Sequence, residues 1–180
     1  YLVGGAVRDA FGVPDSGPIQ LYAAADLHKD RMAGRCKALK ERHPDNVNVP
    51  EERQFVGFDA YRKAIDLLRP GDIAMCTTRA YIRPVHVEYA VSKGINVFME
   101  KPVATDPAGI KSVIESAEMA KKKGLGIVAG TQRRHAGPYN EIIKRVHDGA
   151  IGRITAAQCY WLGGPPWWEK GPRLWHEKFV

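Results

Sequence analysis

Short apolar runs alternate with helix-like segments along residues 19–130, and this alternation limits the fold more than any other feature of the chain. The predicted strands cover residues 19–25, 72–77, 95–99 and 125–130. The predicted helices cover residues 30–42, 59–68, 84–93 and 107–123. Strands that alternate with helices of about 10–17 residues are typical of βαβ units. The sequence therefore predicts an α/β fold with an open, doubly wound parallel sheet.

Two of these helices carry clear signals at their first residues. Asp59 is expected to cap the helix at 59–68, and Asp106 the helix at 107–123, where Pro107 takes the first helical position. The helix after Asp106 also contains apolar residues at helical spacing, namely Ile110, Val113, Ile114 and Ala117.

The pattern changes after Gly130. A helix is predicted at 138–147, a half-exposed strand at 153–162, and then a loop rich in Gly, Pro and Trp. One strand and a loop cannot bury a core by themselves. We therefore expect one domain over 1–130, followed by a linker helix and the incomplete beginning of a second domain over 131–180. The chain starts at Tyr1 without an initiator methionine, so we expect its N-terminus to be truncated.

Composition argues against several classes of partner. The net charge is +7, but the sequence shows no zinc-finger spacing and no aromatic RNA-binding signature, so we expect no nucleic-acid partner. No apolar run approaches the ~20 residues of a membrane helix, and no signal-peptide pattern is present. The three cysteines lack the spacing of metal ligands or of a disulfide framework. These features predict a cytoplasmic protein without a bound metal.

Ligands of doubly wound sheets bind at the carboxyl ends of the strands, where this sequence places unusual residues. Gly4 and Gly5 resemble the end of a glycine-rich turn that opens a helix and approaches a pyrophosphate, although the full G-x-G-x-x-G is absent. Asp26 ends the next strand about 20 residues later, where a carboxylate can bind a ribose diol. The alternative is that Asp26 only caps the following helix.

Two further strands also end in polar residues. Thr77 and Thr78 close the strand at 72–77 and are candidates for nucleotide contacts, and His86 follows near the start of the next helix. A lone histidine is more often a structural residue than a ligand. The strand at 95–99 ends in Glu100 and Lys101. Pro102 then disfavours helical backbone at Lys101, and a lysine in a cleft loses solvation in a way that suits proton transfer.

The segment "GINVFMEKPVATD" resembles the signature of the Gfo/Idh/MocA oxidoreductases. The stretches "AAADLHKDR", "GTQRRHAGPYNEIIKRVHDGAIGRI" and "CYW" support the resemblance. It implies an N-terminal Rossmann domain and a second α/β domain built on an open sheet. It also implies that Lys101 is the catalytic lysine and contacts the cofactor, and that Glu100 binds the nicotinamide ribose. Asp26 would bind the adenosine ribose, and Gly4 and Gly5 the phosphates.

The resemblance places Arg133, Arg134 and His135 near the substrate cleft, with a solvated basic loop as the alternative. The chain also departs from the family, which usually has proline where Arg79 follows Thr78. The family's second catalytic group, a histidine, would lie beyond Val180, so we expect the 180-residue chain alone to be nearly inactive.

The function implied by the resemblance is hydride transfer between NAD(P) and a hydroxyl carbon of a sugar, polyol or derivative. The Asp26 carboxylate would repel a 2′-phosphate, which favours NAD over NADP, although Lys29 and Arg31 lie nearby. Non-catalytic dinucleotide binding in a regulatory protein, or NAD-assisted glycoside cleavage, remain alternatives. The family also implies a homo-oligomer for the full-length protein.

Overall fold

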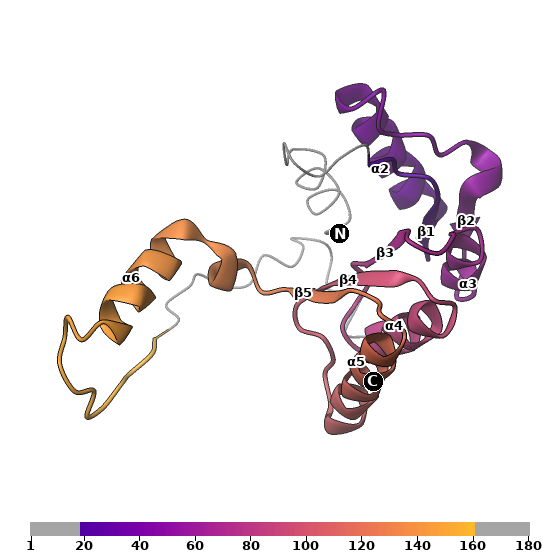
Figure 1. Ribbon diagram of the computed structural model, residues 1–180. Coiled ribbons are helices and arrows are strands. Elements are labelled where there is room, and N and C mark those ends of the chain that lie inside the picture. Colours follow the sequence, from indigo (N-terminus) through magenta and orange to yellow (C-terminus); the bar gives the residue numbers. More distant parts are fainter. Residues whose placement is uncertain (1–18, 161–180) are drawn as a thin grey trace, which may run out of the picture. The chain divides into compact units, whose positions relative to one another are not determined.

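The structure, a computed structural model, describes residues 19–160 (Figure 1). Gly4 and Gly5 and the tryptophan-rich loop after Tyr160 lie outside the described residues. The chain divides into two units, Tyr1–His135 and Ala136–Val180. No helix among residues 19–160 is long and apolar enough to cross a membrane.

The first unit contains parallel strands and helices in alternation, which confirms the predicted α/β class. Strands β1 and β2 pair in parallel, and β3, β4 and β5 form a parallel sheet with β4 in the centre. In chain order the elements are β1 (Ala24–Asp26), α2 (Lys29–Arg42), η1 (Glu51–Arg53), β2 (Gln54–Val56), α3 (Ala60–Ile65), β3 (Ile73–Cys76), α4 (Arg83–Ser92), β4 (Asn96–Glu100), α5 (Pro107–Lys122), β5 (Ile127–Gly130) and η2 (Gln132–His135).

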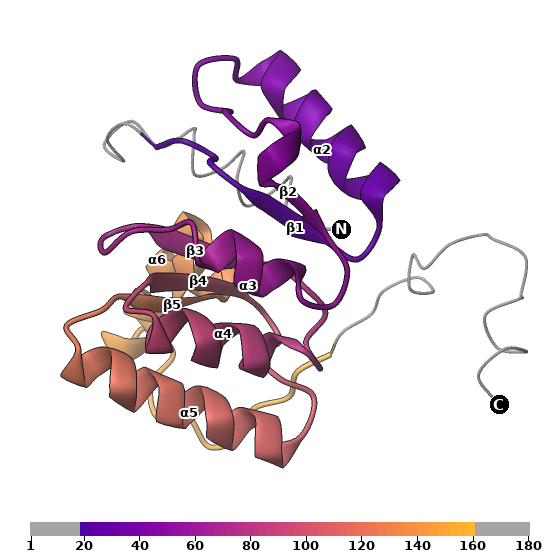
Figure 2. The same cartoon turned by 90° about the vertical axis from the view of Figure 1, so that its right-hand side faces the viewer.

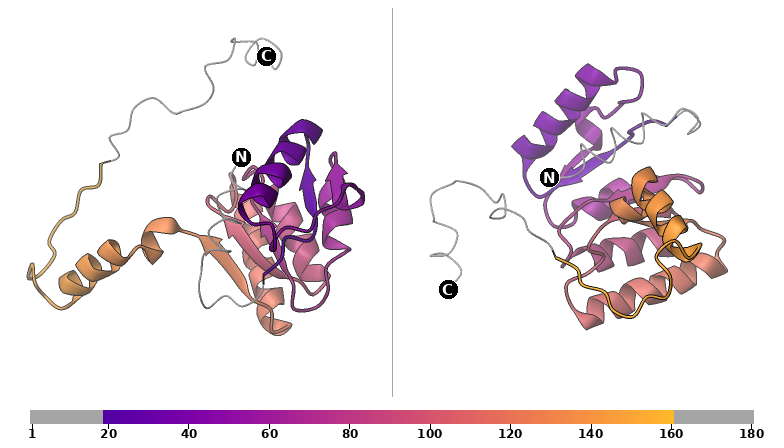
Figure 3. Two further views of the ribbon diagram at one scale, coloured as in Figure 1. Left: turned by 90° about the horizontal axis from the view of Figure 1, so that it is seen from above. Right: turned by 90° about the vertical axis from the view of Figure 1, so that its left-hand side faces the viewer.

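Helices cover the strands in layers. Figure 2 shows the β1–β2 pair between α2 and α3, and both helices contact both strands. Helix α4 packs on β3 and β4, and α5 packs along α4, on the same side of the sheet in Figure 2 and in the right-hand view of Figure 3. The core therefore lies between β3–β4–β5 and these two helices, with Ala74, Cys76, Val87, Val91, Val97 and Met99 among its buried residues.

The two predicted helix caps have different outcomes. Asp106 Oδ1 accepts a hydrogen bond of 2.8 Å from the backbone N–H of Gly109, so the predicted cap of α5 is confirmed. Asp59 occupies the N-cap position of α3, but its side chain makes no capping bond, so the predicted cap is wrong in that respect. Helix α3 also ends at Ile65, earlier than predicted.

The apolar face of α5 differs from the expected one. Val113, Ser116 and Ala120 are buried, whereas Ile110 and Ile114 are 46% and 58% exposed. The first turn of α5 also approaches its neighbours closely. A Cβ on Gly109 would lie 3.0 Å from the Ala104 side chain and 3.2 Å from Pro84, so this position has little room for a side chain.

Two strand predictions also need correction. Residues 19–23 contribute only an isolated bridge between Leu21 and Val47, and β1 itself begins at Ala24. In the second unit, α6 (Gly137–His147) confirms the predicted helix, but residues 153–160 form no strand. A strand needs a partner for its backbone hydrogen bonds, and none pairs with these residues in the described part of the chain.

Candidate functional site

The carboxyl ends of β3, β4 and β5 lie at one edge of the sheet. Cys76 pairs with Met99, and Glu100 pairs with Gly130, so the residues that follow these strands emerge side by side. Thr77 and Thr78 follow β3, and Lys101 follows Glu100 at the end of β4. This is the edge at which parallel α/β sheets bind ligands.

A buried arginine, which the sequence analysis did not single out, joins two of these strand ends. Arg83 is the first residue of α4 and is only 3% exposed. Its Nη1 donates to the carbonyl of Glu100 at 2.6 Å and to the carbonyl of Pro102, and its Nη2 donates to the carbonyl of Thr78. Burial lowers the pKa of Arg83, while Cys76 and Glu100 oppose that shift. An arginine nevertheless stays protonated in proteins.

His86 lies one turn further along α4 and is buried. Its Nδ1 is 3.1 Å from Thr78 Oγ1, and its ring stacks on Tyr61 with centroids 4.2 Å apart. Burial, helped by the charge of Arg83, lowers the pKa of His86 from 6.5 to about 4, so the ring is neutral at pH 7. These contacts match the structural alternative for His86. Contact with a cofactor stays a prediction.

Glu100 and Lys101 differ in their surroundings. The Glu100 carboxylate lies against Gly130, where a Cβ would come within 3.1 Å of both Glu100 Oε2 and the Phe98 ring. Lys101 is exposed, and its peptide bond with Pro102 is cis. The loss of solvation expected for Lys101 is therefore not present within residues 19–160, because these residues do not cover its side chain. Such cover would have to come from other groups, such as a cofactor or substrate.

Asp26 closes a local turn at the end of β1. Its Oδ1 accepts a hydrogen bond of 2.8 Å from the backbone N–H of His28. His28, and not Asp26, occupies the N-cap position of α2. The capping alternative for Asp26 is therefore wrong, and the turn holds the carboxylate at the end of its strand. Within residues 19–160, no hydrogen bond or ion pair links Asp26 to Thr78, Glu100 or Lys101.

The remaining predicted residues lie after β5. Arg133, Arg134 and His135 belong to the short helix η2, and all three are exposed. They follow the strand that pairs with β4, so they emerge at the same edge as Glu100. Their contact with a substrate stays a prediction.

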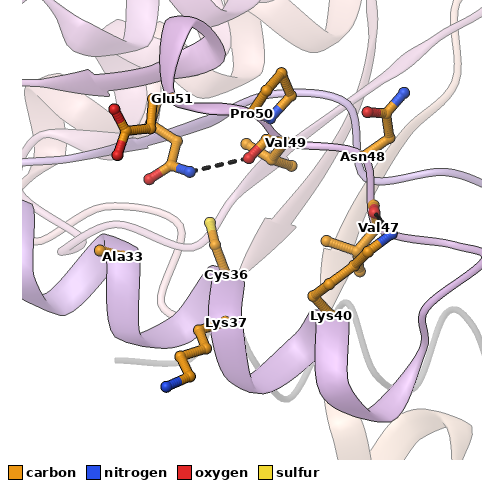
Figure 4. Close-up of a pocket in the computed structure, with 10 residues that line it drawn as sticks. Ala33, Cys36, Lys37, Lys40, Val47, Asn48, Val49, Pro50 and Glu51 are labelled. Carbon is orange, nitrogen blue, oxygen red and sulfur yellow. Dashed lines mark hydrogen bonds between the residues drawn. The ribbon is translucent and has the colours of Figure 1, made fainter.

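A cavity of about 530 Å³ lies elsewhere, between α2 and the chain that leads into β2 (Figure 4). The Lys40 ammonium donates to the carbonyls of Pro44 and Val47, at 2.5 and 2.7 Å. None of the predicted site residues lines this cavity, so it is not the candidate site. Residues 19–160 also contain no group of three or more His, Cys, Asp or Glu side chains that could hold a metal ion.

Parallel strands that alternate with helices, and charged residues at the strand ends, are features of the doubly wound nucleotide-binding folds. A sequence model described as the oxidoreductase family with an NAD-binding Rossmann fold matches residues 17–131. The chain therefore belongs to the Gfo/Idh/MocA family of oxidoreductases.

Individual relatives agree with this assignment. The chain is 34% identical over 140 residues to inositol 2-dehydrogenase 3 of Saccharopolyspora erythraea, covering 78% of this chain and 36% of that protein. It is 27% identical over 146 residues to inositol 2-dehydrogenase of Gluconacetobacter diazotrophicus, covering 79% of this chain and 42% of that protein. The chain thus spans less than half the length of both relatives.

A solved structure supports the fold. The crystal structure of myo-inositol 2-dehydrogenase from Lactobacillus plantarum matches with a TM-score of 0.62 at 23% identity. The match covers 86% of this chain and 41% of that one.

Proposed function

We propose that this chain supplies the NAD-binding domain and the acid/base lysine of an oxidoreductase that acts on a hydroxyl carbon of a polyol or sugar. The observation that carries the proposal is the position of Lys101. It stands exposed at the carboxyl end of the central strand β4, next to Glu100. The relatives named as inositol 2-dehydrogenases support a ring polyol as the substrate class.

The residues present fit a dinucleotide bound at the carboxyl ends of the strands. Asp26 and Glu100 each place a carboxylate at the carboxyl end of a parallel strand, where it can accept hydrogen bonds from ribose hydroxyls. Gly130 lets the Glu100 carboxylate pack directly against the β5 backbone, because a Cβ there would come within 3.1 Å of Glu100 Oε2. The negative charge of Asp26 would repel a 2′-phosphate, which favours NAD over NADP.

When bound, the oxidised nicotinamide supplies the acceptor for the hydride that leaves the hydroxyl-bearing carbon of the substrate. In that direction Lys101 Nζ takes the hydroxyl proton, and in the reverse direction it returns the proton to the carbonyl oxygen. Glu100 and Asp26 hold the two ribose groups. Residues that follow β5, including Arg133, would bind hydroxyl groups of the polyol.

The test is Lys101→Ala in the complete gene product that carries this sequence, with Lys122→Ala as the matched control. Lys122 is an exposed lysine at the end of α5. Loss of a positioned acid/base group typically costs 10²–10⁴-fold, so we expect kcat to fall about 10³-fold. NAD affinity, measured by calorimetry, should change by no more than about threefold, because Lys101 contributes mainly to the proton transfer. A Lys101→Ala enzyme that keeps a third of the wild-type kcat would contradict the role of Lys101.

A further inference from the structure

We propose that Arg83 is a positioning residue for the reaction, and that it fixes the backbone on both sides of Lys101. This inference rests on the proposed function, because it assigns Arg83 a task toward the lysine placed there. Arg83 reaches the lysine segment from the first turn of α4 and lies in the interior, whereas Lys101 itself is exposed.

The hydrogen bonds of Arg83 bracket Lys101. The Glu100 carbonyl belongs to the peptide group that precedes Lys101, and the Pro102 carbonyl to the second peptide group after it. Arg83 Nη1 donates to both. A single buried nitrogen therefore holds the chain before and after the lysine, so the Lys101 side chain extends from a fixed point into solvent.

The same guanidinium connects this segment to the neighbouring strand. Arg83 Nη2 donates to the carbonyl of Thr78, which follows β3. The bonds to Glu100 and Pro102 span 17 and 19 residues of sequence. The position of Lys101 relative to the end of β3 thus depends on one interior side chain, and not only on the local turn.

An arginine is needed because its planar fork carries donors on separate nitrogens, which can meet carbonyls from two strand ends at once. A lysine has one nitrogen and cannot occupy both positions. Within the described residues Arg83 Nε is buried without a hydrogen-bond partner, so the two Nη atoms make all the hydrogen bonds of this side chain. A purely structural role is the competing explanation, and the experiment must separate the two.

The experiment compares Arg83→Lys with Arg69→Lys in the complete gene product. Arg69 is an exposed arginine that precedes the opposite, amino end of β3. We measure kcat and KM for a polyol such as myo-inositol, NAD affinity, and the kinetic isotope effect of the carbon-deuterated polyol. Hydrogen exchange of residues 98–106 is followed by mass spectrometry.

For Arg83→Lys we expect kcat to fall about 30-fold or more, since small errors in the placement of a catalytic group cost on the order of 10²-fold. NAD affinity should stay within about threefold, and the isotope effect should rise as the chemical step becomes more limiting. Exchange should accelerate in residues 98–106 and not in the rest of the unit. Arg69→Lys should change none of these quantities.

A double mutant separates positioning from general stabilisation. If Arg83 acts through Lys101, Arg83→Lys should lower kcat by less than about threefold when Lys101 is already alanine, because the two effects are then not additive. Additive effects, a kcat of Arg83→Lys near that of the wild type, or faster exchange throughout the unit would overturn the inference.

Two further outcomes are decisive. If Arg83→Lys does not fold, Arg83→Gln replaces it, and failure of both variants to fold would assign Arg83 to folding and overturn the positioning role. A wild-type protein that oxidises no polyol would contradict the proposed function instead. The exchange of residues 98–106 would then still show whether Arg83 fixes this segment.

Discussion

The strand ends at Asp26 and at Glu100 are held by different means, although we propose that both bind the same cofactor. Asp26 is held by one hydrogen bond to a backbone amide two residues later. The segment at Glu100 is held by the buried Arg83, which bonds to carbonyls 17 and 19 residues away. The first end depends on its own turn, whereas the second depends on the protein interior. Changes at the Asp26 end should therefore affect mainly NAD binding, whereas changes around Arg83 should affect the placement of Lys101 and the free energy of unfolding.

The largest stability effect is expected at His86, next to Arg83. The pKa of His86 is lowered to about 4 in the folded protein, against 6.5 as its ordinary value. Between these pH values the unfolded chain therefore binds a proton at His86 more readily than the folded protein does. The free energy of unfolding consequently keeps the full contribution of the neutral His86 ring above pH 6.5 and loses it as the pH falls toward 4. The loss amounts to about 3 kcal/mol at most. Urea unfolding at pH 7.5, 6.5, 5.5 and 4.5 measures it.

The control for this prediction removes the titrating ring. His86→Asn should be less stable at pH 7.5 but should lose less stability than the wild type between pH 6.5 and 4.5. His28→Asn changes an exposed histidine at the Asp26 end and should keep the wild-type pH dependence. Parallel stability curves for the wild type and His86→Asn would show that His86 does not carry the effect.

The second largest effect is expected on NAD binding, at the strand end that carries Asp26. Asp26→Ala should weaken NAD binding about 30-fold, equivalent to about 2 kcal/mol for hydrogen bonds to a charged group. The free energy of unfolding should fall by less than about 1 kcal/mol, because within residues 19–160 the side chain makes one hydrogen bond, which closes a local turn. Isothermal titration calorimetry with NAD and urea unfolding measure the two quantities.

Asp26→Asn separates the turn from the charge. It keeps an oxygen that can accept from the His28 amide but removes the negative charge, so the turn should survive while the preference for NAD over NADP narrows. An unchanged NAD affinity in Asp26→Ala would contradict the assignment of Asp26 to the adenosine ribose.

Sequence patterns predicted the parts of the fold that depend on local signals. The apolar run of β4 and the Asp106–Pro107 start of α5 lie where the sequence placed them. Strand β2 has only the three residues Gln54–Val56, too few for a recognisable alternation. The strand predicted at 153–162 is wrong over residues 153–160, because strand formation depends on a partner that periodicity does not reveal.

In the candidate site, too, residues with a local sequence signal could be predicted, whereas a residue that acts through distant contacts could not. Asp26 and Glu100 could be placed at strand ends from the sequence, because each follows directly after an apolar run. Arg83 could not be found in this way, because an arginine before a proline at a helix start is usually solvated. Its role follows only from the direction of three backbone carbonyls, which no residue pattern encodes.

The smallest expected effect is on the free energy of unfolding, and it compares two aspartates at helix starts. Asp106 starts the helix that follows β4, and Asp59 starts the helix that follows β2, and both are exposed. Only Asp106 accepts a hydrogen bond from the helix backbone, at 2.8 Å from Gly109 N. Asp106→Ala should therefore lower the free energy of unfolding by about 1 kcal/mol, the usual cost of a lost N-cap, and Asp59→Ala by a few tenths. Urea unfolding at pH 7.5 compares them. Equal losses would mean that α3 and α5 are anchored alike at their first turns, and that the contrast between the regions is confined to Arg83.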